Sequence, residues 1–213
     1  MQGDVIIVEE HHRRVADEIV GKLIDRIRSA GRIYTITVAG ESGSGKSETA
    51  TAIKDALQER GLKAEILQQD DYFVFPPKTN DGRRRADIGW VGPGEVRLDL
   101  LNEHLAAARK GAASITKPLI VYDDDRITEE ELLLAGVDVV IAEGTYTTSL
   151  EEVDTRVFIQ RDYRDTLQAR QRRGREKFDP YIEKVLEIEH GVISRQGEKA
   201  DVLISRDFEV SFT

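Results

Sequence analysis

The stretch that decides the fold is Gly40-Glu41-Ser42-Gly43-Ser44-Gly45-Lys46-Ser47, which fits the pattern G-x-x-x-x-G-K-[ST] at every fixed position. An apolar, β-branched run over residues 33–39 precedes it, and residues 47–60 carry apolar side chains at helical spacing. The glycines let the backbone curl, so that its amides and the following helix N-terminus hold phosphate oxygens. We therefore predict a phosphate-binding loop, with Lys46 on the β- and γ-phosphates and Ser47 as a Mg²⁺ ligand. The residues expected to bind the nucleotide are Gly40, Glu41, Ser42, Gly43, Ser44, Gly45, Lys46, Ser47 and Glu48.

The rest of the chain alternates predicted strands and helices. Besides 33–39, the runs that predict strands are 64–67, 137–142, 155–160, 202–205 and 208–212. The runs that predict helices are 15–28, 47–60, 96–110, 129–135 and 180–193. Alternation of this kind predicts an α/β sandwich of three layers, with helices on both faces of a mostly parallel sheet. The strands lack polar alternation, as expected where both sheet faces are buried.

Length and composition predict one domain over residues 1–213, with an N-terminal extension at residues 1–32. The chain has no cysteine, which excludes disulfide scaffolds, thiolate metal sites and cysteine nucleophiles. No apolar run is long enough for a membrane span, and the apolar stretch at residues 5–8 is too short for a signal peptide. We expect a cytoplasmic protein without a membrane partner. The net charge of −9 argues against a general nucleic-acid binder.

One segment is strongly basic within this acidic chain. Residues 161–177 hold seven arginines and lysines against three acidic residues. A solvated helix face with ion pairs explains such a run equally well on charge alone. Phosphoryl transfer gives the second explanation, because arginines stabilise the charge on the equatorial oxygens. Gly174 predicts a mobile turn, so we expect an arginine-rich lid with Arg170 and Arg173 as the catalytic arginines.

Carboxylates follow two of the predicted strands. Asp70 and Asp71 come after the strand at 64–67, and Glu143 ends the strand at 137–142. Ligands of open α/β sheets bind beyond the carboxyl ends of the strands, so these side chains lie where a substrate is expected. An aspartate there takes a proton from an acceptor hydroxyl or positions Mg²⁺. Glu143 is predicted to serve Mg²⁺ together with Ser47.

The segment 70–93 is rich in Gly, Pro, Asn and Asp and carries four aromatic residues. We predict an irregular substrate loop, because a loop of this length in a compact domain is usually functional. Trp90 either stacks on a substrate ring or anchors the loop to the core.

A phosphate loop leaves two broad classes of function. One is a kinase that phosphorylates a small acceptor, and the other is an NTPase that acts as a switch or regulatory module. The N-K-x-D motif that reads guanine is missing; the nearest stretch is Thr116-Lys117-Pro118-Leu119. ATP is therefore the expected nucleotide.

Several segments, in order, resemble the uridine kinase and phosphoribulokinase family of P-loop kinases, which includes the nicotinamide riboside kinases. Besides the phosphate loop they are Asp70-Asp71-Tyr72-Phe73, Trp90–Leu101, Lys117–Arg126, Ala142-Glu143-Gly144, Asp162–Arg175 and Lys199–Ile204. The likeness implies a five-stranded parallel core, ATP with Mg²⁺, and phosphorylation of a hydroxyl on a small metabolite. It places the acceptor-activating base on Asp70.

The resemblance also implies that the segment holding Tyr122 and Arg126 contacts the acceptor. The full set of residues expected to contact it is Asp70, Tyr72, Arg83, Trp90, Tyr122 and Arg126. The chain departs from the family in three places: Thr166 and Leu167 stand near the usual paired lid arginines, Arg83-Arg84-Arg85 lies in a long substrate loop, and Asp123–Asp125 replaces a usual histidine. We predict an ATP-dependent kinase for a nucleoside or related riboside, in a chain that forms a homodimer; sugar phosphates and hydroxy acids stay open as acceptors.

Overall fold

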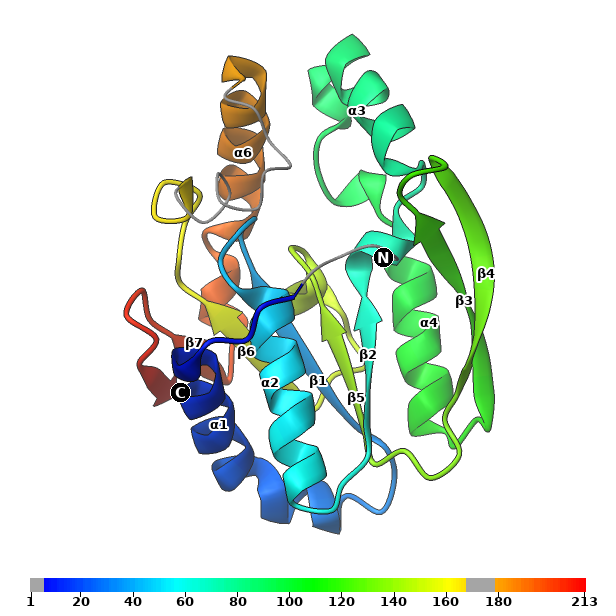
Figure 1. Cartoon of the computed structure of the whole chain (residues 1–213), viewed down its shortest axis with the longest axis vertical. Helices are drawn as coiled ribbons and strands as arrows, with labels where there is room; N and C mark the ends of the chain where they lie inside the picture. Colours follow the sequence, from blue (N-terminus) through cyan, green and yellow to red (C-terminus); the bar gives the residue numbers. More distant parts are fainter. Residues whose placement is uncertain (1–5, 168–178) are drawn as a thin grey trace.

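The central sheet of the computed structural model, which describes residues 6–167 and 179–213, has the strand order β2-β5-β1-β6-β7-β8 (Figure 1). The strands are β1 (Tyr34–Gly40), β2 (Ala64–Gln68), β5 (Val139–Glu143), β6 (Thr155–Ile159), β7 (Val202–Ile204) and β8 (Val210–Phe212). The first five in spatial order are parallel, and β8 pairs antiparallel with β7 at one edge. The predicted α/β fold with a mostly parallel core of five strands is confirmed, and β8 extends it.

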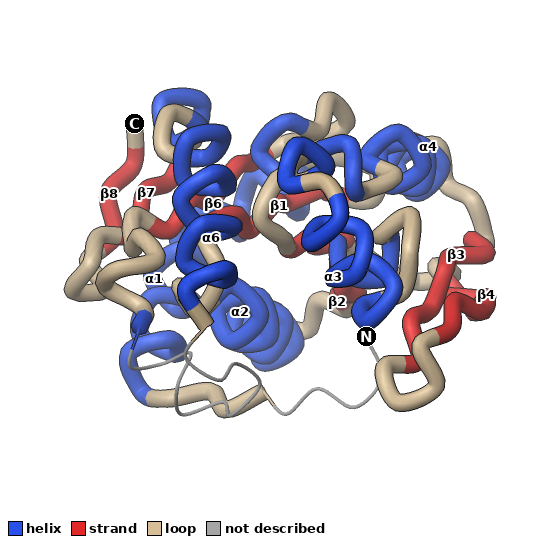
Figure 2. The backbone as a smooth tube through the Cα atoms, turned by 90° about the horizontal axis from the view of Figure 1, so that it is seen from above, coloured by secondary structure: helices blue, strands red, loops and turns tan. Residues whose placement is uncertain are grey.

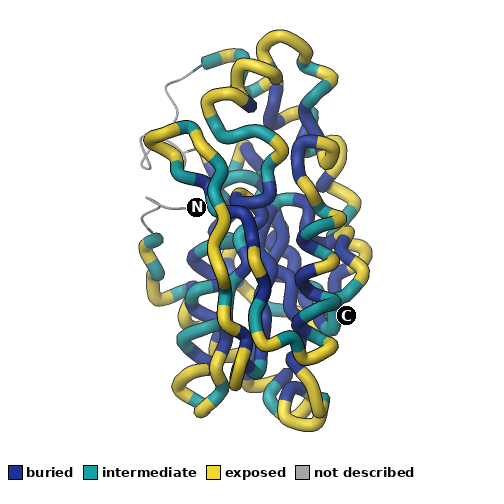
Figure 3. Tube along the Cα trace, turned by 90° about the vertical axis from the view of Figure 1, so that its right-hand side faces the viewer, coloured by how far each residue is buried: buried dark blue, intermediate teal, exposed yellow. Residues whose placement is uncertain are grey.

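Helices cover both faces of this sheet (Figure 2). Helices α1 (Glu10–Ser29) and α2 (Lys46–Glu59) pack on one face, and α4 (Leu98–Arg109) and α6 (Pro180–Ile193) lie on the other. The sheet therefore separates two apolar cores, and the strands between them are buried on both sides. Buried segments run through the middle of the molecule in Figure 3, and exposed ones gather at its two ends.

The N-terminal extension contributes a layer of the fold. Helix α1 buries Val15, Ile19 and Leu23 against α2 and the sheet, following the apolar period seen in the sequence. Asp17 accepts a hydrogen bond of 2.6 Å from Arg60 at the end of α2. None of the described helices is long and apolar enough to cross a membrane.

The predicted helix at 129–135 is wrong. Strands β3 (Ser114–Val121) and β4 (Arg126–Leu133) form an antiparallel hairpin that stands apart from the main sheet. Lys117 faces Glu130 across the hairpin, and their charged groups lie 3.0 Å apart. The glutamate run favours a helix by propensity, but this cross-strand pairing stabilises the extended form.

The segment 70–93 is more ordered than predicted. It contains the ten-residue helix α3 (Pro77–Ala86), of which only Asn80 is buried. Such a helix has no apolar period for sequence reasoning to detect. Its first turn is held from outside, because Asp125 in the β3–β4 turn accepts hydrogen bonds from the amides of Lys78 (2.7 Å) and Thr79 (3.1 Å). The 3₁₀ turns are Gln69–Tyr72, Ile88–Trp90, Pro93–Glu95, Thr147–Ser149 and Gln196–Lys199.

Candidate active site

The strand order brings the predicted site residues together at the carboxyl ends of neighbouring strands. Strand β5 lies between β2 and β1, and its register pairs Glu143 with Gln68 on one side and with Val38 on the other. The phosphate loop follows β1, and Asp70 follows β2. Residues far apart in the sequence therefore meet beyond the carboxyl ends of three adjacent strands, where α/β sheets bind ligands.

The phosphate loop is tightly wound. A Cβ at Gly40, where φ is +155°, would lie 2.8 Å from Ser44 Oγ and 3.1 Å from the carbonyl oxygen of Ile159, so only glycine fits. Ser44 Oγ is buried and makes no hydrogen bond. Lys46 Nζ donates to the Glu41 carbonyl oxygen at 2.9 Å, which folds the lysine over the loop. An unsatisfied buried hydroxyl and a cation beside a helix N-terminus fit a bound phosphate group.

Ser47 and Glu143 form the candidate Mg²⁺ site. Ser47 Oγ donates to Glu143 Oε1 at 3.1 Å. Burial and the neighbouring charge of Asp70 raise the pKa of Glu143 to about 7. Among the described residues no three His, Cys, Asp or Glu side chains gather as a metal cluster. A hydroxyl and one carboxylate nevertheless fit Mg²⁺, which is usually held by one or two protein oxygens together with phosphate oxygens and water.

The two adjacent aspartates have different environments. Asp71 is 2% exposed; its carboxylate lies 3.0 Å from Lys117 Nζ and accepts a hydrogen bond of 3.0 Å from the Ile120 amide. It therefore fastens the end of β2 to the hairpin. Asp70 is exposed and lies close enough to Glu143 to raise its pKa. Of the two, Asp70 is the one that a substrate can reach.

Glu41 has a role that the sequence analysis did not give it. Its carboxylate accepts a hydrogen bond of 2.8 Å from the Tyr163 amide at the base of the predicted lid, and its Oε1 lies 2.6 Å from His190 Nδ1 on α6. Thr166 Oγ1 also donates to the Ser42 carbonyl oxygen at 2.9 Å. The loop that is predicted to hold phosphate is thus tied to the lid base and to α6.

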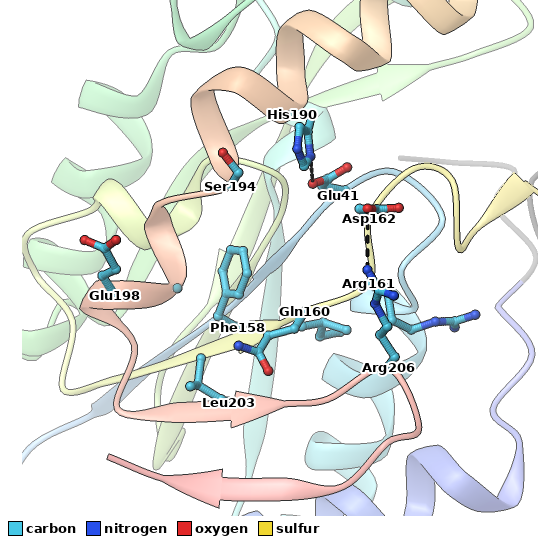
Figure 4. Close-up of a pocket in the computed structure, with 12 residues that line it drawn as sticks. Glu41, Phe158, Gln160, Arg161, Asp162, His190, Ser194, Glu198, Leu203 and Arg206 are labelled. Carbon is cyan, nitrogen blue, oxygen red and sulfur yellow. Dashed lines mark hydrogen bonds and ion pairs between the residues drawn. The ribbon is translucent and has the colours of Figure 1, made fainter.

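The Glu41–His190 pair and Phe158 line a cavity of about 390 Å³ (Figure 4). The sequence analysis missed His190 because it lies in an ordinary helical stretch, and only the fold brings it to the loop. No sequence signal could have found it.

Tyr72 is misassigned as an acceptor contact. Its side chain is completely buried, and its hydroxyl lies 2.8 Å from His104 Nδ1 in the core beneath α4. Burial raises the pKa of Tyr72 and lowers that of His104. The aromatic residue after the aspartates packs the loop against the core, and its side chain does not reach the site.

The other predicted acceptor contacts lie around α3 and the hairpin turn. Trp90 donates from its indole nitrogen to Asn80 Oδ1 at 2.9 Å, which joins two parts of the segment 70–93; stacking on a substrate and anchoring to the core both stay predictions. The Arg83 guanidinium lies 5.0 Å from the Phe75 ring centroid. Tyr122 and Arg126 are exposed on the β3–β4 turn. Their contact with an acceptor stays a prediction, and Arg170 and Arg173 lie outside the described residues.

Three comparisons place this chain among known proteins. The fold and the phosphate loop define the class of P-loop kinases. The model of the phosphoribulokinase/uridine kinase family matches residues 35–207, so the chain belongs to that family, as its motifs predict.

Curated relatives and solved structures agree with this assignment. The chain is 30% identical to the bifunctional alpha-galactosidase/sucrose kinase AgaSK of Mediterraneibacter gnavus, over 86% of this chain and 23% of that protein's length. It is 29% identical to the uridine kinase of Geobacillus kaustophilus, over 72% of this chain and 74% of the relative. The structure of D-glycerate 3-kinase from Cryptococcus neoformans shares the fold, with a TM-score of 0.62 and 15% identity. The match covers 94% of this chain and 99% of that chain.

Proposed function

We propose that this protein is an ATP-dependent kinase that transfers the γ-phosphoryl group to a hydroxyl of a small metabolite. The observation that carries the proposal is the meeting of Asp70 with the Ser47–Glu143 pair beside the phosphate loop. Family membership supports it, because the similar proteins described above are kinases of small hydroxylated molecules.

Each residue at the site has a chemical task in this proposal. Lys46, Ser44 and the loop amides bind phosphate oxygens, and Ser47 and Glu143 hold Mg²⁺, which neutralises charge on the transferred group. Asp70 accepts the proton of the acceptor hydroxyl. At the same time the hydroxyl oxygen bonds to the γ-phosphorus, and the bond between that phosphorus and the ADP oxygen breaks. The Tyr163–Glu41–His190 connection, in which the Glu41 side chain is buried, keeps the loop and the lid base in a fixed relation.

The acceptor in this proposal is a nucleoside or related riboside, in line with the uridine kinase relative. A saccharide is the second candidate. It is favoured by the 30% identity to the sucrose kinase enzyme, which extends over 86% of this chain. A homodimer stays a prediction that light scattering can check.

The test is ADP formation with ATP and Mg²⁺ against a panel of nucleosides, ribosides, sugars, sugar phosphates and hydroxy acids. We expect one class of acceptor to raise turnover strongly, and mass spectrometry to find that acceptor heavier by one phosphoryl group. ATP hydrolysis that no acceptor changes, but that a protein partner stimulates, would instead support a nucleotide-dependent switch.

A further inference from the structure

Three aromatic side chains from two distant segments of the chain pack against the phosphate loop. We call them the aromatic wedge: His11 and His12 at the start of α1, and Phe208 in the turn between β7 and β8. The ring centroids of His11 and Phe208 lie 4.0 Å apart. Those of His12 and Phe208 lie 5.1 Å apart, with the rings nearly perpendicular. The family match over residues 35–207 includes none of the three, and the proposed transfer chemistry does not use them.

The wedge lies against Gly45, the last glycine of the phosphate loop and the N-cap residue of α2. Gly45 has a φ of +100°, a backbone conformation that residues with a side chain rarely adopt. A Cβ at this position would lie 3.1 Å from His12 Nε2 and 3.7 Å from Phe208 Cε1. Two rings of the wedge therefore pack at the point where the loop turns into the helix.

Contacts from both segments hold the wedge in place. The Glu9 amide donates to His12 Nδ1 at 3.1 Å, as part of the cap of α1. Arg14 Nη2 donates to the Phe208 carbonyl oxygen at 3.1 Å, and the Arg161 guanidinium lies 5.0 Å from the Phe208 ring centroid. Phe208 has a φ of +59°, a strained conformation that persists only where the surrounding structure fixes it. The wedge is therefore a fixed element of the fold.

Both histidines of the wedge are neutral. His12 Nδ1 accepts a hydrogen bond from an amide, so it carries no proton and the ring proton is on Nε2. Burial lowers the pKa of His11 below its ordinary value of 6.5, so this ring is uncharged at neutral pH. Neutral rings do not attract phosphate by charge, and the contact with Gly45 therefore acts through packing.

The phosphate loop depends on such packing because three of its residues are glycines: Gly40, Gly43 and Gly45. Glycine loses more conformational freedom on ordering than any other residue. The hydrogen bonds described above already hold the middle of the loop to the lid base and to α6. The wedge holds the far end of the loop, where the amides that follow Gly45 open α2.

We propose that the aromatic wedge is a positioning element for phosphate binding. It fixes Gly45 before the nucleotide arrives, so that the amides at the start of α2 are already aimed at the phosphate groups. The loop motif supplies the donors, and the wedge reduces the entropy lost when they bind. The inference rests on the proposed function, because it takes the loop as the phosphate site, and it makes the N-terminal extension part of that site.

The test compares ATP with inorganic tripolyphosphate, which has three linked phosphate groups and no nucleoside. Calorimetry measures the Kd of each ligand with Mg²⁺ in the wild type, in His12→Ala and in Phe208→Leu. We expect each variant to raise both Kd values by the same factor, about tenfold, because one more backbone residue must be ordered on binding. With the best acceptor of the panel, kcat at saturating ATP should stay unchanged, as for a loss of uniform binding.

Leu23→Ala is the matched control. Leu23 is 2% exposed and packs in the core from the same helix, about three turns beyond His12. Its truncation should lower the melting temperature and leave both Kd values unchanged at a temperature where the variant is folded. A purely structural role of the wedge would give this same result in the wedge variants, so unchanged Kd values in His12→Ala and Phe208→Leu would overturn the inference.

The remaining outcomes separate the inference from the proposed function. A rise in the Kd of ATP alone would overturn the inference, because the wedge would then contact the nucleoside. Failure of the wild type to bind tripolyphosphate would also overturn it, and failure to bind ATP as well would overturn the proposed function. Phe208→Leu keeps an apolar side chain in the turn, so it decides the question if His12→Ala does not fold.

Discussion

The proposed nucleotide side and the proposed acceptor side of this protein are built in different ways. The nucleotide side is one continuous unit, in which β1, the phosphate loop and α2 follow one another within residues 34–59. The acceptor side is assembled from α3, the β3–β4 hairpin and α6, which are separated in sequence and meet only in the fold. Its contacts are long-range ion pairs, such as Arg84 with Glu189 and Arg85 with Asp179 at 2.9 Å.

This difference teaches where each part of the function is specified. Phosphate binding needs backbone amides and a few fixed residue types, so a local motif is sufficient. Acceptor selection depends on side chains that different elements bring together. Substitutions on the nucleotide side should therefore change the rate of catalysis. Substitutions on the acceptor side should change the choice of acceptor and the stability of the fold.

The largest effect is expected from the adjacent pair Asp70 and Asp71. Asp70→Asn removes the proposed base, and we expect kcat to fall by about 10²- to 10⁴-fold with ATP affinity unchanged. Steady-state kinetics measures kcat, and isothermal titration calorimetry measures the affinity for ATP. Near-normal kcat in Asp70→Asn would assign proton removal elsewhere.

Asp71→Asn should behave in the opposite way. It breaks the buried pair with Lys117, and loss of one partner of such a pair destabilises a protein by about 3–5 kcal/mol. Chemical denaturation should show this loss. If Asp71→Asn folds with wild-type stability and loses turnover, the roles given to the two aspartates are reversed.

Glu143→Gln should change the dependence on Mg²⁺. The amide keeps an oxygen next to Ser47 but removes the charge, so we expect the Mg²⁺ concentration at half-maximal activity to rise about tenfold or more. Titration with MgCl₂ at saturating ATP measures it. Glu129→Gln, an exposed change on β4, is the control and should leave the titration unchanged.

A pH effect should come from the acceptor side. Burial raises the pKa of Glu189 to about 7 from an ordinary value near 4.5, so the folded state favours the neutral acid. The stability that this group contributes is complete below about pH 4.5 and is lost as the pH rises through 7. Denaturation of the nucleotide-free protein between pH 5 and 8 should show a decline that Glu189→Gln makes shallower.

Glu187, exposed on the same helix, provides the control for that experiment. Glu187→Gln should keep the wild-type slope. An equal slope in wild type and Glu189→Gln would show that Glu189 is ionised in the folded protein throughout this range.

The smallest effect is expected at the contact between the phosphate loop and α6. His190→Gln weakens the contact with Glu41 but leaves the loop residues in place, so we expect a rise of a few-fold in the KM for ATP with little change in kcat. Steady-state kinetics with varied ATP measures it. A large loss of kcat would place His190 in the transfer step itself.

The sequence predicts the sheet, both helical layers and the phosphate loop because each has a local signal: an apolar run, a helical period or a glycine pattern. It fails on α3 and on β4, the second strand of the hairpin. Helix α3 buries only Asn80 and is capped by Asp125 from another element, and β4 is extended because Lys117 pairs with Glu130. Those determinants lie in residues distant in sequence, so no window of the sequence contains them.

The same reason limits prediction of the candidate site. Asp70, Ser47 and Glu143 each stand at a strand or helix end that periodicity can locate. His190 gains its position only from the folded chain, and Tyr72 looks like a site residue until its burial is known.

The most direct test of the central claim follows the γ-phosphoryl group of ATP. Single-turnover reactions with γ-labelled ATP, Mg²⁺ and the best acceptor of the panel should put the label on an acceptor hydroxyl, one for each ADP formed. Label found only in inorganic phosphate, at a rate independent of every acceptor, would contradict a kinase and identify the site as that of an ATPase.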